Sequence, residues 1–170
     1  MKKTCLLLIA SLFLVYCKAG KETISESMKI ADVTSPCPEK ALCNFEILKD
    51  KSLDIKTDDT GHTYFNLKDA PGKTVFKYTH KKITDPNLMD AGYSETIIFE
   101  TNSNTKNLNY SGADIQKVKM LLNVQCYCPG KAGIYIIKEG TLNYKDNKLH
   151  IEIPQIVHGQ KTKIVDVVVR

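Results

Sequence analysis

The sequence predicts an all-β domain, an antiparallel sandwich or barrel of about eight to ten strands. Two observations lead to this prediction. From residue 37 onward, apolar and polar residues alternate with period two in a series of short segments. Turn-forming residues separate these segments at intervals of roughly ten residues. At 170 residues, the chain has room for one such domain and is short for two.

The first predicted strands lie in the N-terminal half of the domain. Phe45 and Ile47 alternate with polar neighbours, and Leu53 and Ile55 repeat the pattern. Three further strands are predicted at 62–67, 73–80 and 92–101. The turns predicted to separate them lie at Asp58-Asp59-Thr60-Gly61, Ala70-Pro71-Gly72 and Asp85-Pro86-Asn87.

Residues 141–153 predict a β-hairpin with its two-residue turn at Asp146-Asn147. With the turn there, both strands place their apolar residues on the same side, which a true hairpin register requires. The facing pairs are Tyr144 with Leu149 and Leu142 with Ile151 on the apolar side, and Asn143 with His150 and Thr141 with Glu152 on the polar side. The β-branched run 162–169 predicts a terminal strand.

Four cysteines lie in the predicted domain, as Cys37 and Cys43 and as Cys126 and Cys128. The second pair continues an apolar row in a strand predicted over 117–128. Residues i and i+2 of an extended strand lie at the outer limit for a disulfide, so a bond between Cys126 and Cys128 is disfavoured. We therefore expect two structural disulfides that join the first pair of cysteines to the second, in either of two pairings. Each would close a loop of roughly 85–90 residues and contribute about 4–5 kcal/mol.

The same four cysteines offer an alternative, a thiolate site for zinc or copper(I). The predicted export disfavours it, because thiols outside the cytoplasm tend to be oxidised. A redox role is also disfavoured, since the chain has no C-x-x-C and cysteines in an apolar row are poorly placed to react. Our prediction is that the protein has no metal and no cofactor.

The N-terminus reads MKKTCLLLIASLFLVYC, two lysines followed by an apolar run of thirteen residues from Cys5 to Cys17. A helix of this length rises about 20 Å, short of the roughly 30 Å hydrocarbon core of a bilayer. The pattern is typical of a secretory signal. The predicted organisation is a signal peptide at 1–16, a flexible polar tether at 17–36 and one β domain at 37–170.

The segment Leu14-Val15-Tyr16-Cys17 resembles the lipobox of bacterial lipoproteins, with Tyr16 where that motif has a small residue. The chain is similar in this to small uncharacterised lipoproteins of Bacteroidetes-type bacteria. The resemblance implies cleavage before Cys17 and acylation of that cysteine, which anchors the protein in a membrane. Lys18 then indicates the outer membrane rather than the inner one. The alternative is an ordinary signal peptide cut after Ala19, which gives a free periplasmic or secreted protein.

The net charge and the absence of known catalytic motifs disfavour two classes of function. Residues 1–16 hold two of the 24 basic residues and none of the 19 acidic ones, so the remainder carries a net charge of +3. Nucleic-acid binding is not expected, because the chain has no dense basic stripe. No catalytic motif is present. We expect a non-catalytic module that binds an envelope protein or a small ligand through an exposed aromatic patch. The tyrosines that could form this patch are Tyr64, Tyr78, Tyr93 and Tyr127.

An exported enzyme is the alternative. His150 with Glu152 could form an acid–base pair on the polar side of the hairpin. Asp166 interrupts an apolar run and shares a face with Ile164 and Val168, so a carboxylate that points into the core is expected there. The structural explanation is an inward charge on an edge strand, which prevents edge-to-edge aggregation.

Overall fold

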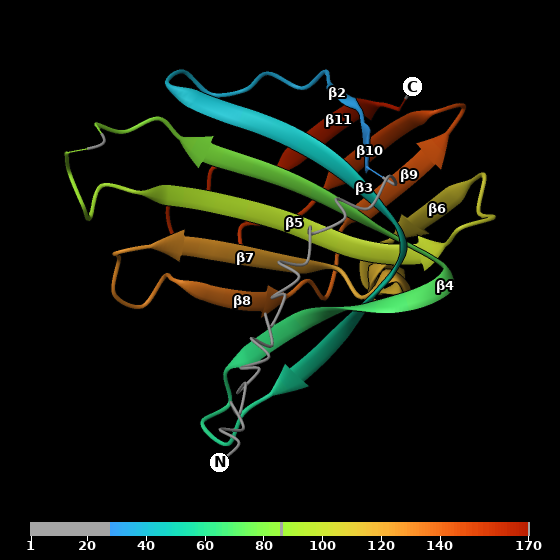
Figure 1. Ribbon diagram of the computed structural model, residues 1–170, viewed down its shortest axis with the longest axis horizontal. Coiled ribbons are helices and arrows are strands. Elements are labelled where there is room, and N and C mark those ends of the chain that lie inside the picture. The colour runs from blue at the N-terminus through green and yellow to red at the C-terminus, as the bar shows by residue number, and fades with distance from the viewer. Residues whose placement is uncertain (1–27, 86, 170) are drawn as a thin grey trace, which may run out of the picture.

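The structure, a computed structural model, describes residues 28–85 and 87–169 and shows two antiparallel sheets packed on each other (Figure 1). The predicted all-β sandwich is confirmed. The six-stranded sheet has the order β1 (Met28–Ile30), β3 (Ala41–Thr57), β4 (Thr63–Lys82), β5 (Tyr93–Asn102), β7 (Leu121–Cys126) and β8 (Gly133–Ile136). The five-stranded sheet has the order β2 (Asp32–Val33), β11 (Ile164–Val168), β10 (Lys148–Glu152), β9 (Thr141–Lys145) and β6 (Leu108–Ser111).

The sandwich begins earlier in the chain than the sequence predicts. Strand β1 pairs with β3, and β2 pairs with β11. Ala31, between these two strands, is buried in the core. Residues 28–33, which were expected in the tether, therefore belong to the sandwich. The predicted signal peptide at 1–16, the lipidation site Cys17 and the rest of the tether to residue 27 lie outside the described residues.

The hairpin predicted for residues 141–153 is confirmed in its register. β9 and β10 pair Tyr144 with Leu149 and Leu142 with Ile151. Asp146 and Asn147 form the turn with φ angles of 50° and 61°, the left-handed pair that a type I′ hairpin turn requires. β11 then pairs with β10, which confirms the predicted terminal strand.

The inner faces of the two sheets form the main core. Phe45, Phe76 and Ile97 from the six-stranded sheet meet Leu142 and Ile151 from the other. The ring of Phe76 lies 5.0 Å from that of Phe99 and 6.2 Å from that of Tyr144 across the interface. Burial of these apolar side chains is the main source of stability for the sandwich.

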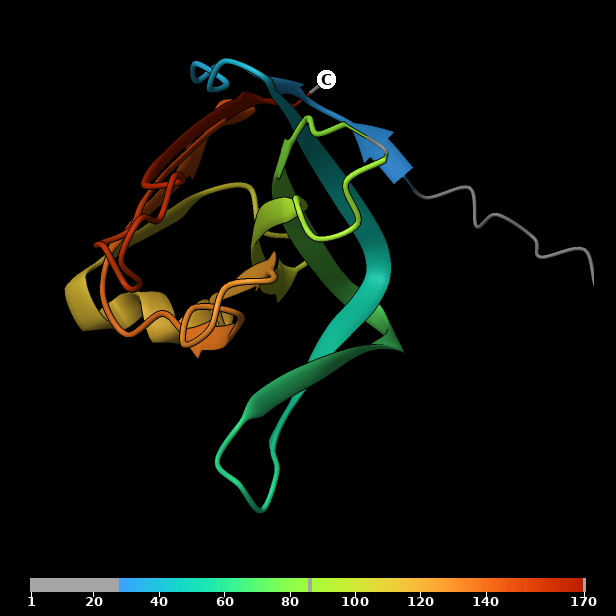
Figure 2. The same ribbon diagram turned by 90° about the vertical axis from the view of Figure 1, so that its left-hand side faces the viewer.

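Strands β3 and β4 bend together halfway along their length (Figure 2). The turn predicted at Ala70-Pro71-Gly72 is instead a bulge within β4, opposite Asp50. Asp50 and Gly72 have φ angles of 54° and 82°, and the backbone N–H of Gly72 donates to Oδ1 of Asp50 at 3.1 Å. An insertion of this kind bends a strand instead of ending it. The predicted turn at 58–61 does form the tip of this hairpin.

The bent half of the hairpin covers part of the outer face of the six-stranded sheet. Leu53 packs there with Val75, Ile98 and Leu121 in a second apolar cluster. Glu100 of β5 joins the two layers. Its carboxylate accepts hydrogen bonds from the Leu53 N–H at 2.8 Å and from the Lys119 ammonium at 2.8 Å. Strand β5 is therefore buried on both faces.

The segment before β7 is not extended, which corrects the strand predicted for 117–128. Gly112–Val118 form a 3-10 helix, η1, with Ile115 and Val118 buried. Lys119 adopts a left-handed conformation with φ 52°, and β7 begins at Leu121. Among the described residues, no helix is long and apolar enough to cross a membrane.

Candidate functional site

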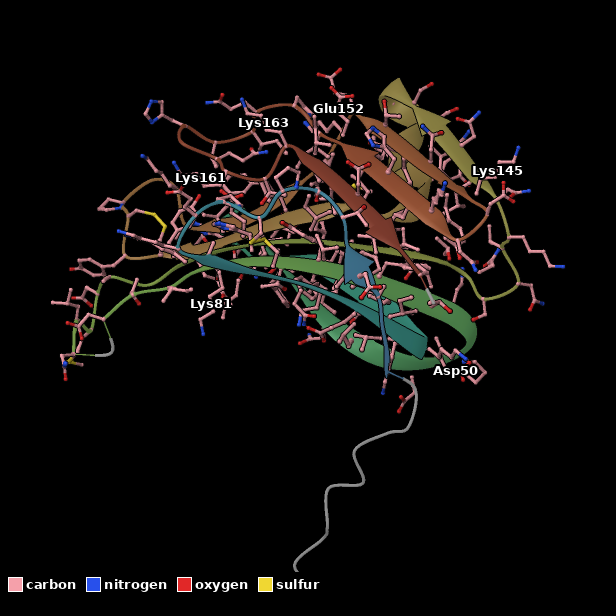
Figure 3. All side chains as sticks on the ribbon, turned by 90° about the horizontal axis from the view of Figure 1, so that it is seen from above. Asp50, Lys81, Lys145, Glu152, Lys161 and Lys163 are labelled. Atoms are coloured by element: carbon pink, nitrogen blue, oxygen red, sulfur yellow. A yellow bond between two sulfur atoms is a disulfide. The ribbon has the colours of Figure 1, made fainter. Side chains whose placement is uncertain are left out.

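Both disulfides lie at the end of the sandwich that Lys81 and Lys161 mark in Figure 3, opposite Asp50 and Lys145. Cys37 bonds Cys43, and Cys126 bonds Cys128, with Cα–Cα distances of 5.8 and 5.3 Å. The prediction that all four cysteines form disulfides is confirmed. The predicted connectivity is wrong, because the pairing that the sequence disfavoured is the one that forms.

Two features explain the correction. β7 ends at Cys126, and the chain bends at Tyr127, which brings the Cα atoms of Cys126 and Cys128 to 5.3 Å, closer than the roughly 6.6 Å that two residues of an extended strand span. In addition, β4 and β5 lie between β3, which carries Cys43, and β7. Three strand spacings amount to about 14 Å, well beyond the reach of a disulfide.

The thiolate metal site does not assemble. Each cysteine has its bonding partner within its own short segment, and the two segments are separated by β4 and β5. Within residues 28–85 and 87–169, no group of three or more histidine, cysteine or acidic side chains is arranged to hold a metal ion.

The largest hollow at this end is a groove of about 1040 Å³ beside β7 and β8. Its walls come from the tip of the β3–β4 hairpin, from the β7–β8 edge of the sheet and from the loop before β11. Its lining includes His62, Asn123, Cys126, Gly133, Ile136 and Ile156. The lining holds apolar side chains together with the amides of Asn123 and Gln125, which suits a ligand with both kinds of group.

A smaller hollow of about 310 Å³ adjoins the groove. Lys81, Met89 and Tyr93 contribute to its wall, together with Cys126 and Tyr127. Met89 and Tyr127 are 96% and 80% exposed. Cys126 thus lines both hollows, whereas Cys128 lines neither.

Behind the hollows, a buried carboxylate holds the loop that precedes β11. Glu95 of β5 is fully buried, and its oxygens accept the backbone N–H groups of Lys161 at 2.7 Å and Thr162 at 2.6 Å. The Tyr93 hydroxyl also donates to Glu95. Burial raises the pKa of Tyr93, and the hydrogen bond to the carboxylate raises it further. Gln160 bridges the same loop, donating to the Thr162 carbonyl at 2.7 Å.

His80 faces Glu95 across β4 and β5. The imidazole is 3% exposed, and its Nδ1 has no hydrogen-bond partner in the part of the chain that the structure describes. Burial lowers its pKa, while the charge of Glu95 acts in the opposite direction. Nearby, the Tyr78 hydroxyl donates to Sγ of Cys43 at 3.2 Å, and burial raises the pKa of Tyr78.

On the outer face of the five-stranded sheet, His150 and Asp166 form a cross-strand pair. His150 Nδ1 lies 2.7 Å from Asp166 Oδ1, beside a hollow of about 460 Å³. Asp166 does not point into the core, which corrects the expectation. Val165 and Val167 occupy the inner side, and β11 pairs on both sides, with β10 and β2. Glu152 is exposed and pairs in register with Ile164 instead of contacting His150.

The predicted tyrosine patch does not form. Tyr78 is buried and Tyr93 is half-buried against Glu95, so only Tyr64 and Tyr127 of the four are exposed, at 42% and 80%. The sequence analysis also missed the buried Glu95 and Glu100. The signal for them was the two glutamates that flank the apolar run Ile97-Ile98-Phe99 within one predicted strand. Comparison with protein-family models, with curated proteins and with solved structures finds no match to this chain.

Proposed function

We propose that this protein is an exported lipoprotein, anchored through acylated Cys17, whose sandwich is a non-catalytic module that binds an extended polypeptide of the cell envelope. The observation that carries the proposal is the groove of about 1040 Å³ that is lined in part by β8, the edge strand of its sheet. Lys18 after the acylated cysteine supports the outer membrane as its location.

The chemistry of the groove favours an extended peptide. β8 is the last strand of its sheet, so its outer edge has no neighbouring strand within the described residues. Such an edge can pair with an added strand through main-chain hydrogen bonds. Gly133 permits close approach of a backbone, and Ile134 and Ile136 offer apolar contacts for alternate side chains.

The lipid anchor would hold the groove near its partners. Ten residues separate Cys17 from Met28 in the sequence, and a chain of that length reaches at most about 40 Å. More than one acyl chain gives stable anchoring. Cys17→Ser is expected to abolish incorporation of labelled palmitate and to release the protein from the membrane fraction. Cys5→Ser, within the predicted signal peptide, is the control and should change neither. Equal labelling of both variants would contradict the anchor.

The groove can be tested with two matched isoleucines. Ile136 lines the groove and is 46% exposed, whereas Ile164 lies on the five-stranded sheet and is 52% exposed. A photoreactive amino acid at position 136 should capture an envelope polypeptide in cells, and one at 164 should not. Ile136→Glu should weaken the complex, whereas Ile164→Glu should leave it intact. Capture at both positions, or at neither, would refute the groove as the binding site.

A hydrolase is the second candidate, favoured by the 2.7 Å contact between His150 and Asp166. A carboxylate in this position orients an imidazole as a general base. Loss of a measured hydrolytic activity in both His150→Gln and Asp166→Asn, with unfolding curves unchanged, would support it. No activity on a panel of ester, glycoside and peptide substrates would leave the binding module as the function.

A further inference from the structure

We propose that the Cys126–Cys128 disulfide is redox-active and accepts electrons from the paired cysteine thiols of a reduced exported polypeptide. This activity goes beyond the proposed binding function and rests on it only for the class of substrate. The observation that carries it is the position of this bond, in the shorter of the two disulfide rings of the described residues and beside two hollows that Cys126 lines.

Ring size distinguishes the two disulfides. Cys126 and Cys128 are two positions apart, with Tyr127 alone between them, whereas Cys37 and Cys43 are six apart. A disulfide stabilises the fold by removing chain entropy from the unfolded state, and this stabilisation is smaller when the closed loop is shorter. The entropic stabilisation is therefore smaller for the Cys126–Cys128 bond, and this bond should be the easier of the two to reduce.

Two hollows lie beside the Cys126–Cys128 bond, on the side of Cys126. Cys126 ends β7, Cys128 follows a bend at Tyr127, and both cysteines are half-buried. Both hollows reach Cys126. In the other pair, Cys37 is exposed outside the strands, and Cys43 lies within β3 and accepts a hydrogen bond from Tyr78. A thiolate can approach the Cys126–Cys128 disulfide along either hollow.

Lys81 supplies a cation at this position. Its side chain contributes to the wall of the smaller hollow together with Cys126. A nearby ammonium group stabilises a thiolate, both the attacking one and the one that leaves. Asp90 lines the same hollow and partly offsets this charge.

The exchange balances without another reactant. A substrate thiolate attacks one sulfur of the Cys126–Cys128 bond; a mixed disulfide forms, and the other sulfur leaves as a thiolate and takes up a proton. The second substrate thiol then attacks the mixed disulfide, a disulfide forms in the substrate, and the second protein cysteine is released. Two electrons and two protons pass to the protein, which ends as a dithiol.

The first experiment measures both disulfides in one sample. The purified protein is equilibrated in buffers with graded ratios of reduced to oxidised glutathione, free thiols are alkylated, and each cysteine peptide is quantified by mass spectrometry. We expect Cys126–Cys128 to be half-reduced at a value of [GSH]²/[GSSG] at least about twofold below that for Cys37–Cys43, as the difference in loop entropy requires. Reduction of both at the same value, greater resistance of Cys126–Cys128, or a different connectivity would overturn the proposal.

The second experiment tests electron transfer. Oxidised protein is mixed with a reduced peptide that contains two cysteines, and peptide disulfide is followed over a single turnover. Cys37→Ser/Cys43→Ser, which keeps the proposed pair, should retain the reaction, and Cys126→Ser/Cys128→Ser should lose it. Lys81→Met should slow it several-fold, and Lys82→Met, its neighbour, should not. Equal rates in both double variants would refute the site.

The redox and binding proposals fail separately. Ile136→Glu removes the groove contact and should leave the glutathione equilibrium of Cys126–Cys128 unchanged. If this variant also shifts that equilibrium tenfold, the bond is not an independent site and the redox proposal falls. If polypeptide capture is lost and the glutathione equilibrium is unchanged, the result bears on the binding groove and leaves the redox proposal standing.

Discussion

The carboxylate of Glu95 accepts the backbone N–H of Thr162 at 2.6 Å across the interior of the sandwich. The two residues are 67 positions apart, on the six-stranded sheet and on the loop before β11. The same carboxylate also accepts the N–H of Lys161. One buried side chain thus satisfies two adjacent main-chain donors and fixes the loop that borders the groove at Ile156.

Replacing this carboxylate by an amide should destabilise the protein. Glu95→Gln turns one acceptor into a donor opposite an N–H group, so we expect the free energy of unfolding to fall by about 2–3 kcal/mol. Urea unfolding measures this, and hydrogen exchange at residues 161 and 162 should accelerate. Glu152→Gln, on an exposed position of β10, is the control and should change stability by less than about 0.5 kcal/mol. Similar unfolding curves for both variants would contradict the role of Glu95.

His80 should make stability depend on pH in the weakly acidic range. Burial lowers its folded pKa below the ordinary value of 6.5. Between these two pKa values the unfolded chain binds more protons, so stability is retained above pH 6.5 and decreases as pH falls toward the folded pKa. The slope is at most about 1.4 kcal/mol per pH unit.

Urea unfolding at about pH 7.5 and pH 5.5 tests this dependence. His80→Gln should reduce the difference in stability between the two conditions. The control His62→Gln, at the exposed hairpin tip, should keep the wild-type difference. An undiminished difference in His80→Gln would assign the pH dependence to other groups.

Glu100 should anchor the bent half of the β3–β4 hairpin. Burial alone would raise the pKa of this carboxyl, but hydrogen bonds from Lys119, Leu53 and Ser52 together hold it below its ordinary value. Its contribution to stability is therefore present above pH 4.5 and is lost as pH falls through the lowered folded pKa. Glu100→Gln should cost about 1–3 kcal/mol in urea unfolding at neutral pH.

The exposed ion pair of Lys51 and Asp69 on the same hairpin provides the control for Glu100. Asp69 is 87% exposed at its side chain, and exposed pairs contribute little. Asp69→Asn should change stability by less than about 0.5 kcal/mol. If it costs as much as Glu100→Gln, burial of the Glu100 pair is not what stabilises the hairpin.

The disulfides should each stabilise the fold modestly. For loops as short as these, chain entropy predicts a loss of about 2 kcal/mol in Cys37→Ser/Cys43→Ser and about 1.5 kcal/mol in Cys126→Ser/Cys128→Ser. Urea unfolding of the two double variants measures both values. A loss of about 4–5 kcal/mol would instead fit the long loops of the cross-linked pairing, and it would contradict the connectivity described above.

Several elements follow from local sequence alone. The alternation of apolar residues predicted the sandwich, and the β9–β10 hairpin was predicted to the residue pair. The reason is that strand pairing through a two-residue turn depends on neighbours in sequence, so Asp146 and Asn147 determine the register.

Other features depended on residues distant in sequence. Gly72 sits in a segment whose composition suits a turn as well as a bulge, and the contacts of Leu53 with the sheet decide for the bulge. The alternation through Cys128 was extrapolated past the end of β7, where the chain turns.

The glutamates of β5 show most clearly what cannot be predicted from local sequence. Among the described residues, Tyr93 is the one donor to Glu95 that is close in sequence, and the main-chain donors Thr162 and Leu53 lie 67 and 47 positions from the glutamates that accept from them. The sequence by itself determined the fold class, the presence of disulfides and the hairpin register, because these follow from period, composition and adjacency. Only the tertiary structure decided the disulfide pairing, the bent hairpin with its groove and the buried carboxylates, because each depends on which distant strands become neighbours.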